Sequence, residues 1–275
     1  MPELPEVETT AQGLNLVIPE QTIMAMRIYD SRLRWPVDKS IIKKVQNTII
    51  GTLTRRSKYL LMPVYDHDQL QGQLMIHLGM SGRLQVMPGS TLREKHSHIE
   101  WALSNEQHLR YTDPRRFGSV HWIEPDTLHP LLSKLGPEPL STDFNGQYLF
   151  DKTRRRQTTI KVLIMNAHIV VGVGNIYASE TLFRAGILPT TLASTITLDQ
   201  AKLLAKHIKA TLKAAIKAGG TTLRDFASSD GKPGYFQQKL NVYGREGEPC
   251  RVCGAKVQHL KIGQRATFFC EGCQG

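Results

Sequence analysis

The chain has 275 residues, of which 40% are hydrophobic and 21% charged, and its formal net charge is +11 at pH 7. This length allows a sizeable core and suggests one or two domains of about 150 residues each. No apolar run approaches the ~20 residues of a membrane span, and the start MPELPEVE lacks the basic and apolar regions of a signal peptide. We therefore expect a cytoplasmic protein without a membrane partner. The basic excess favours a polyanion such as nucleic acid, and a merely solvated basic surface is the alternative.

The first predicted element is a helix near the N-terminus. Its apolar residues recur at spacings of three and four and form one stripe, made of Leu4, Val7, Ala11, Leu14 and Ile18. Pro2 and Pro5 suit a first turn, where backbone N–H groups have no helical partner. The sequence thus predicts an amphipathic helix that begins within the first few residues.

Residues 22–125 are typical of β-structure. Short runs bounded by Gly, Pro and Asp predict the strands, namely Thr52–Val64, Gln73–Leu78, Ile99–Leu103 and Gly118–Ile123. Several strands at this spacing favour a sandwich or a barrel. The segment Pro130–Gly146 contains LGPEPLS and has no clear period, so we predict a linker between domains there.

The apolar period becomes helical after this linker. Three stripes predict helices within Ile160–Ala167, Ile176–Phe183 and Leu198–Ala215. The turn VVGVGN (170–175) lies between the first two. The segment Gly219–Gly234 is rich in Gly, Ser and Thr, which is typical of a mobile loop.

All four cysteines lie in the last 26 residues and form two C-x2-C pairs separated by sixteen residues: Cys250, Cys253, Cys270 and Cys273. Each pair places two thiolates on one tight turn, and two such turns complete a tetrahedron with no open position. The spacing predicts one structural zinc ion, and four incidental reduced thiols are the alternative. Between the pairs, Val257–Leu260 and Arg265–Phe269 are predicted to form a hairpin with Arg265 near its tip or on its second strand.

Pro2 is chemically eligible as a nucleophile. We expect removal of Met1, because proline at the second position permits methionine trimming. The freed secondary amine, with a pKa near ~7.7–8.0, is partly unprotonated at neutral pH. It can attack a sugar carbon and form an iminium, and the adjacent Glu3 can move protons. The alternative is that Pro2 simply begins the helix.

Seven sequence blocks carry a more specific signal, and they are MPELPEVET (1–9), SKYLL (57–61), HLGMSGRL (77–84), RYTDPRRFG (110–118), LGPEPL (135–140), GVGNIYASE (172–180) and SDGKPGYF (229–236). With the cysteine module they resemble, in the same order, the bacterial formamidopyrimidine-DNA glycosylases. The resemblance implies an α+β fold, with an N-terminal β-sandwich flanked by helices and a C-terminal helix–two-turn–helix domain with a zinc-finger β-hairpin. The implied divisions are a catalytic domain (1–130), a linker (131–150), a helix–two-turn–helix domain with a lesion-recognition loop (151–238) and the zinc finger (239–275).

The family chemistry implies a bifunctional DNA glycosylase and AP lyase of base excision repair. Pro2 matches the Schiff-base nucleophile, Glu3 the proton donor in base release, and Glu6 a supporting carboxylate. Lys58 matches the lysine assigned to β-elimination. Arg265 matches the arginine assigned to δ-elimination and phosphate contact. The implied substrates are 8-oxoguanine opposite cytosine and ring-opened purines, and the implied product is a one-nucleotide gap.

The resemblance also implies how damaged double-stranded DNA is held. Met80, Arg115 and Phe117 match the residues that fill the space left by the flipped base, although core packing is the alternative for Met80 and Phe117. The positions expected to contact DNA along its backbone are His96, Arg115, Arg155, Arg156, Gln157, Lys161 and Asn175. Gln157 is uncharged where relatives often carry lysine. Arg224 lies in the segment Thr221–Tyr235, which resembles the lid over the flipped purine.

We expect a monomer in the bacterial cytoplasm that associates with the nucleoid through DNA. The nearest alternative is an endonuclease VIII-like glycosylase for oxidised pyrimidines, whose N-terminus reads PEGPE where this chain has PELPE. A second alternative is a non-enzymatic zinc-ribbon protein that only binds DNA.

Overall fold

The computed structural model describes residues 2–219 and 240–275. These residues belong to two compact units: a first unit up to Ser133, and a second unit from Lys134 to Ala218 and from residue 240 to the C-terminus. No helix in the described ranges is long and apolar enough to cross a membrane.

Helix α1 (Leu4–Leu14) is the predicted N-terminal helix, and its apolar stripe is buried. Glu3 is the N-cap residue and Pro5 lies in the first turn, whereas Pro2 precedes the helix. Ile18 is also buried, but the helix ends before it. The amphipathic period thus fixes which side of α1 faces the core.

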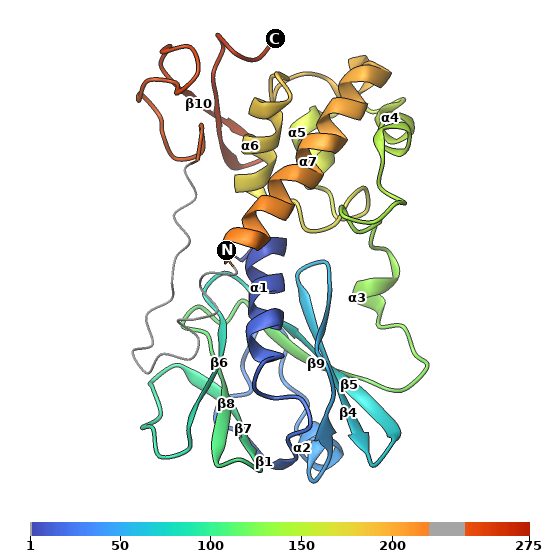
Figure 1. Ribbon diagram of the computed structural model, residues 1–275, viewed down its shortest axis with the longest axis vertical. Coiled ribbons are helices and arrows are strands. Elements are labelled where there is room, and N and C mark those ends of the chain that lie inside the picture. The colour runs from blue at the N-terminus through green and yellow to red at the C-terminus, as the bar shows by residue number, and fades with distance from the viewer. Residues whose placement is uncertain (1, 220–239) are drawn as a thin grey trace. The chain divides into compact units, whose positions relative to one another are not determined.

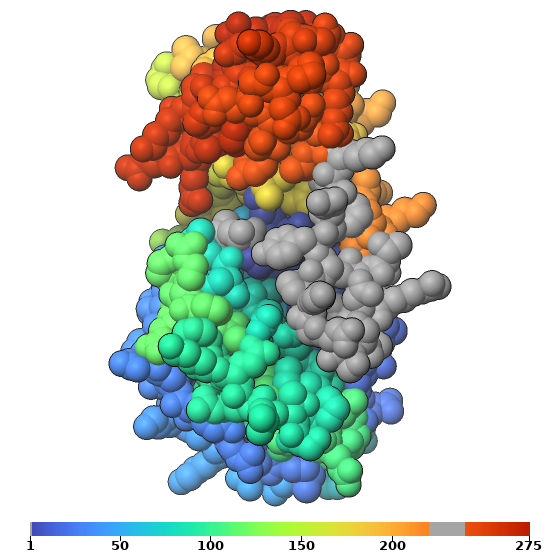
Figure 2. All heavy atoms as spheres, turned by 90° about the vertical axis from the view of Figure 1, so that its left-hand side faces the viewer, coloured from blue at the N-terminus to red at the C-terminus, as the bar shows by residue number. Residues whose placement is uncertain are grey.

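Two antiparallel sheets form most of the first unit, as predicted for residues 22–125 (Figure 1). One sheet has the order β1-β7-β8-β6, with β1 (Ile23–Ile28), β6 (Arg83–Pro88), β7 (Ser97–Leu103) and β8 (Gln107–Thr112). The other has the order β2-β4-β5-β9, with β3 paired to β4, and contains β2 (Ile49–Ile50), β3 (Thr54–Arg56), β4 (Tyr59–Asp66), β5 (Gln69–His77) and β9 (Ser119–Ile123). The segment in teal and green that includes β6, β7 and β8 covers one face of this unit (Figure 2).

Side chains from both sheets and from α1 form one core, which includes Trp101, Leu109, Leu60, Ile76 and Val7. The first unit is therefore the expected β-sandwich with a helix packed on it. A short helix, α2 (Ile41–Val45), interrupts the β-region and was not predicted. Its five residues are too few for a clear apolar period.

The second unit is helical. The predicted linker contains the short helix α3 (Pro130–Ser133) and no other helix or strand before α4 (Gly146–Thr153), which the sequence did not predict. The three predicted helical stripes correspond to α5 (Ile160–Met165), α6 (Asn175–Arg184) and α7 (Leu198–Gly219), and a 3-10 turn spans Ala193–Thr195. Their apolar faces form a second core that includes Leu163, Leu182 and Leu204.

The cysteine module is the last part of the second unit along the chain. Strands β10 (Gln258–Ile262) and β11 (Arg265–Phe269) form the predicted antiparallel hairpin, and Arg265 pairs with Ile262 beside its turn. The Glu180 carboxylate of α6 accepts hydrogen bonds from the backbone N–H groups of residues 241, 242 and 243 and from the Asn241 side chain. This buried carboxylate fixes the chain that leads into the module.

Candidate active site and nucleic-acid interface

The start of α1 holds Glu3 in one conformation. Its side chain is 2% exposed and accepts a hydrogen bond from the Glu6 backbone, while the Glu6 Oε2 atom accepts one from the Glu3 backbone N–H at 2.8 Å. Such a reciprocal capping box satisfies two N–H groups that the helix leaves free, and the helix dipole favours carboxylates there. Pro2, half-buried, directly precedes this fixed carboxylate. The structure thus gives Glu6 a definite contact with Glu3.

Lys58 lies in the two-residue turn between β3 and β4 and is half-buried. Arg55 connects this turn to α1, because its Nε donates to Glu8 Oε2 at 2.7 Å and its Nη1 donates to the Ser57 carbonyl at 2.8 Å. Asn15 adds two hydrogen bonds from the end of α1 to the Leu53 backbone. These contacts fix the turn that carries the candidate lysine relative to the helix that begins beside Pro2.

His77, at the end of β5, is a neighbour of Lys58 that sequence reasoning missed. Burial lowers the pKa of His77 to about 4, and the positive charge of Lys58 adds to this effect. Its Nδ1 accepts a hydrogen bond from the Gly79 N–H at 3.0 Å, and its ring lies 4.9 Å from the Tyr59 ring. His77 is therefore uncharged near neutral pH. Its only sequence signal was its place at the start of the HLGM block.

Met80 and Phe117 are 37% and 46% exposed, so the alternative that they pack in the core is wrong. Arg115 is exposed as well, and its guanidinium carbon lies 4.9 Å from the centre of the Phe117 ring. The neighbouring Arg116 instead pairs with Asp30 at 2.7 Å. A flexible apolar side chain, a cation and an aromatic ring are thus exposed on two turns of the first unit.

A buried carboxylate joins these two turns. Asp113 is 0% exposed, and its side chain accepts from the Ser81 hydroxyl at 2.6 Å and from the Gly118 N–H at 2.9 Å. Its backbone N–H donates to the carbonyl of His96, a half-buried residue that was predicted to contact phosphate. Sequence reasoning missed Asp113. The Asp-Pro pair in RYTDPRRFG marks a turn, but does not reveal the partners of the carboxylate.

The backbones of the two turns also approach closely. A Cβ atom on Gly79, whose φ is +62°, would lie 2.4 Å from the Gly118 nitrogen. A Cβ atom on Gly118 would lie 1.7 Å from the Tyr111 hydroxyl oxygen. Only glycine fits at either position, so the spacing between the turns is set by the backbone.

Lys161 differs from its predicted placement, because it is 0% exposed. Its Nζ donates to Asn175 Oδ1 at 2.7 Å, to Thr267 Oγ1 at 2.6 Å and to the Ala266 carbonyl at 3.1 Å. Asn175, the first residue of α6, donates to the same carbonyl at 2.9 Å. A direct phosphate contact by Lys161 therefore does not fit this geometry. Its ammonium instead fixes the start of α6 against β11.

The predicted DNA contacts that follow α4, and Arg265, are exposed. Arg155, Arg156 and Gln157 follow α4 on the surface, whereas Arg154 stacks on the Phe150 ring with its guanidinium carbon 4.1 Å from the ring centre. Arg265 is exposed at the start of β11. Arg224 and the segment Thr221–Tyr235 lie outside the described residues.

The four cysteine sulfur atoms lie within 4.8 Å of one another and form the one cluster of three or more metal-ligating groups in the described ranges. Across the two C-x2-C turns, Cys250 Sγ lies 3.8 Å from Cys273 Sγ and Cys253 Sγ lies 3.4 Å from Cys270 Sγ. A tetrahedron with Zn–S bonds of about 2.3 Å has edges of about 3.8 Å. The sulfur atoms therefore fit a zinc ion, and four thiolates leave it no open position.

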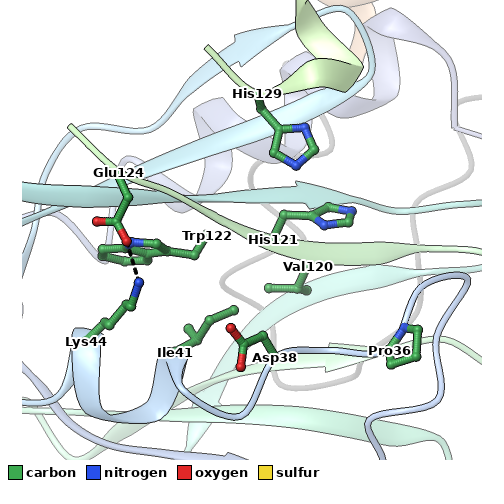
Figure 3. A pocket seen from close by; sticks show the side chains of 9 residues that line it. All are labelled: Pro36, Asp38, Ile41, Lys44, Val120, His121, Trp122, Glu124 and His129. Carbon is green, nitrogen blue, oxygen red and sulfur yellow. Dashed lines mark hydrogen bonds and ion pairs between the residues drawn. The ribbon is translucent and has the colours of Figure 1, made fainter. Parts of the chain in front are cut away.

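The first unit also contains a hollow of about 320 Å³ that no predicted site residue lines (Figure 3). The centre of the His121 ring lies 5.5 Å from that of Trp35 and 4.9 Å from that of His129. Burial lowers the pKa of both histidines. On the other side of the hollow, Lys44 forms an ion pair with Glu124 (Figure 3). The residues that line the hollow are thus different from those of the candidate site.

Three family models match the chain in succession. The N-terminal domain of formamidopyrimidine-DNA glycosylase matches residues 1–120, and its H2TH domain matches residues 135–227. A zinc finger found in FPG and IleRS matches residues 247–275. The matched order agrees with a sandwich, a helical part and a cysteine module.

Curated relatives match the whole chain. A formamidopyrimidine-DNA glycosylase of Hydrogenovibrio crunogenus is 52% identical over 275 residues, covering 100% of this chain and 96% of the relative. The protein of the same name from Escherichia coli strain 55989 is 51% identical over 274 residues, covering 100% of both chains.

Solved structures of similar proteins contain damaged DNA. The Lactococcus lactis enzyme bound to abasic-site DNA has a TM-score of 0.87 and 32% identity, and 99% of each chain is covered. MutM in complex with DNA containing carbocyclic 8-oxo-G has a TM-score of 0.87 and 35% identity, and 100% of each chain is covered.

Proposed function

The chain belongs to the formamidopyrimidine-DNA glycosylase family, and from this membership we propose how its own residues remove oxidised purines from duplex DNA. Its activity is that of a DNA glycosylase and AP lyase of base excision repair, with 8-oxoguanine and formamidopyrimidines as substrates. The observation that carries this conclusion is the match of the full chain, at 51–52% identity, with all three family modules in order.

In the proposed first step, the Pro2 amine attacks C1′ of the extruded nucleotide. The bond between C1′ and the base breaks, and the base leaves with a proton supplied by Glu3. The C1′–O4′ bond then breaks, O4′ takes up the proton lost from the Pro2 nitrogen, and an iminium links Pro2 to the opened sugar. The support for the role of Glu3 is its burial beside Pro2 and its fixed orientation in the capping box with Glu6. Glu6 acts through Glu3 and is a positioning residue.

Strand cleavage follows from the same covalent intermediate. We assign Lys58 to β-elimination, which removes the 3′ phosphate, and Arg265 to δ-elimination, which removes the 5′ phosphate. The support for Lys58 is its half-buried position on a turn that Arg55 joins to α1. The support for Arg265 is its exposed position beside the turn of the zinc-finger hairpin.

Extrusion of the target base leaves a space in the duplex, and filling it offsets part of the cost of unstacking. Met80 and Phe117 are proposed to enter the stack, while Arg115 hydrogen-bonds the unpaired cytosine. Their exposure on two turns joined by Asp113 supports these roles.

Damaged double-stranded DNA is the proposed partner, and a monomer is the proposed form. The proposed backbone contacts are His96, Arg115, Arg155, Arg156, Gln157 and Asn175, with Arg224 in the lesion-recognition segment. Lys161 orients Asn175 from inside the protein. The divisions 1–130, 131–150, 151–238 and 239–275 remain part of this proposal. The succession of the three family models supports their order, and the H2TH match at residues 135–227 begins inside the proposed linker.

The zinc ion has a structural role. Cys250, Cys253, Cys270 and Cys273 would hold it, and it would supply no reaction chemistry because four thiolates saturate it. The curated relatives are bacterial. We propose that this protein acts in the bacterial cytoplasm, at the nucleoid.

Borohydride trapping on an 8-oxoguanine:cytosine duplex tests the proposed chemistry. The wild-type protein is expected to give a covalent DNA adduct, and Pro2→Gly or retention of Met1 should abolish it. Glu3→Gln should bind the damaged duplex without excising the base. Absence of an adduct with an abasic duplex would refute the Schiff base. Faster cleavage of a thymine glycol duplex would favour the endonuclease VIII-like alternative.

A further inference from the structure

Helix α7 carries a row of lysines on its solvent side. They occur at spacings of four, three, four and four residues and so share one helix face, which we call the lysine stripe: Lys202, Lys206, Lys209, Lys213 and Lys217. Four of them are exposed and Lys209 is half-buried. The stripe extends for about 22 Å along the helix.

Acidic side chains do not balance this charge. Asp199, at the start of α7, is the sole acidic residue in the helix, and its carboxylate lies 3.5 Å from Lys202. Within the described ranges, Lys206, Lys213 and Lys217 have no hydrogen-bond or ion-pair partner. Like charges three and four residues apart destabilise a helix. A solvated helix face more commonly alternates the two signs.

The stripe borders a groove of about 500 Å³ where the start of α4 meets α7. The two helices are in direct contact, because a Cβ atom on Gly146 would lie 2.5 Å from the Lys202 Cα atom. Lys209 is fixed in the groove by a 2.6 Å hydrogen bond to the Ser141 carbonyl. The side chain of Asn145 caps α4 by accepting from the Tyr148 N–H. The free ammonium groups of the groove therefore come from α7.

This groove is lined by other residues than the nucleic-acid interface described above. Asn175 and Arg265 of that interface lie on α6 and β11. Arg155, Arg156 and Gln157 follow the end of α4, whereas the groove lies between the start of α4 and α7. Within the second unit, α4 and β10 lie on opposite sides of α7 (Figure 1). The lysine stripe is thus an additional basic surface.

We propose that the lysine stripe binds the phosphate backbone of a second segment of duplex DNA, separate from the segment that carries the lesion. Lysine neutralises phosphate as a point charge and reads no base, so a regular row of lysines suits sequence-independent contact. Its length of about 22 Å corresponds to roughly six base pairs at 3.4 Å each. DNA is also the polyanion that this family handles, which favours it over an acidic protein.

The test uses protein whose lesion site is already filled. Wild-type protein is trapped with borohydride on a short damaged duplex, and the purified adduct is titrated with a labelled undamaged duplex at several salt concentrations. The K206Q/K213Q variant removes two cations of the stripe. The matched control K39Q/K43Q removes two exposed lysines beside and within α2 and changes the net charge equally.

The wild-type and control adducts should bind the second duplex. In K206Q/K213Q, the slope of log K against log salt should be smaller by about 2, and affinity at low salt should fall at least tenfold. Excision from the short duplex should be unchanged. Equal slopes in K206Q/K213Q and the control would overturn the proposal. If a polyglutamate peptide binds the wild-type adduct and K206Q/K213Q loses no duplex affinity, the proposal is overturned in favour of an acidic protein partner.

Failure of the trapping step would count against the proposed function and not against the lysine stripe. The untrapped proteins can then be compared on the undamaged duplex alone, where the same difference in slope is expected. Equal thermal midpoints and circular dichroism spectra would establish that the variants fold alike.

Discussion

The Nε atom of Arg55 lies 2.7 Å from the Glu8 Oε2 atom and so joins strand β3 to helix α1. The side chains are only 9% and 26% exposed, which shields the pair from water and salt more than a surface pair. The same guanidinium donates to the Ser57 carbonyl, beside Lys58. One side chain therefore couples the helix that begins near the proposed nucleophile to the turn with the proposed elimination lysine.

Arg55→Gln should uncouple these two elements. We expect cleavage of a preformed abasic duplex to slow by about tenfold, because the Lys58 turn loses its connection to α1, and stability to fall by about 1–2 kcal/mol. Single-turnover cleavage and urea unfolding measure the two effects. Lys44→Gln breaks the exposed pair with Glu124 and is the control, which should change neither. Wild-type cleavage by Arg55→Gln would contradict the role.

Asp113→Asn should separate the Met80 turn from the turn with Arg115 and Phe117. An amide accepts through one atom only, so either the Ser81 hydroxyl or the Gly118 N–H loses its acceptor, at a cost of about 1–3 kcal/mol. We expect kcat/KM on 8-oxoguanine:cytosine duplexes to fall at least tenfold. Asp68→Asn removes the same charge from an exposed hairpin and should have no effect. Equal values for both variants would refute this role of Asp113.

His77 should make stability fall in acid. Its pKa is lowered from 6.5 to about 4, so between these values the unfolded chain binds a proton that the folded chain excludes. The stability contributed by neutral His77 is full above pH 6.5 and is lost as the pH falls to 4, by about 3 kcal/mol in total. Urea unfolding at several pH values measures this slope. His77→Asn keeps an acceptor for the Gly79 N–H and should flatten it; an unchanged slope would assign it to other groups.

Cys250→Ser should lose zinc and DNA affinity together. Three remaining thiolates hold the ion more weakly, and the module around β10 and β11 has only a small core besides the metal. Metal content by mass spectrometry and duplex binding by fluorescence anisotropy check this expectation. Tight duplex binding by a verified zinc-free protein would contradict it.

Lys161→Met should weaken the second unit. The buried oxygen atoms of Asn175, Ala266 and Thr267 lose their shared cationic donor, which we expect to cost about 2–4 kcal/mol. Duplex affinity should fall through the displaced Asn175 while the salt slope stays unchanged, because the ammonium touches no phosphate. A slope smaller by about 1 would instead indicate a direct phosphate contact.

The sequence predicted those elements whose signal is local. The apolar period gave α1 and α7, and the cysteine spacing gave the metal cluster and the hairpin between its halves. Helices α2 and α4 were not predicted. The five residues of α2 are too few for an apolar period, and α4 buries only Leu149 and Thr153, so it has no continuous apolar stripe.

The contacts that organise the site join residues far apart in the sequence. Arg55 and Glu8 are separated by 47 residues, and Asp113 and Ser81 by 32. No local pattern reveals such a pair, because the fold brings its members together. The burial of Lys161 has the same origin. The family resemblance implied a phosphate contact at this position, but its partner Thr267 is 106 residues away in the sequence.

Gly79 and Gly118 bring the two exposed turns into backbone contact, and the buried Asp113 carboxylate joins the turns through Ser81. The exposed side chains of Met80 and Phe117 are not among the groups that join the turns. The fold of the two turns therefore does not depend on which side chains are exposed at positions 80 and 117. Other side chains can be substituted for Met80 and Phe117 with little cost to folding, and such exchanges would change how the space left by the extruded base is filled. Substitutions on these two turns can therefore alter how the protein contacts damaged DNA while the β-sandwich stays unchanged.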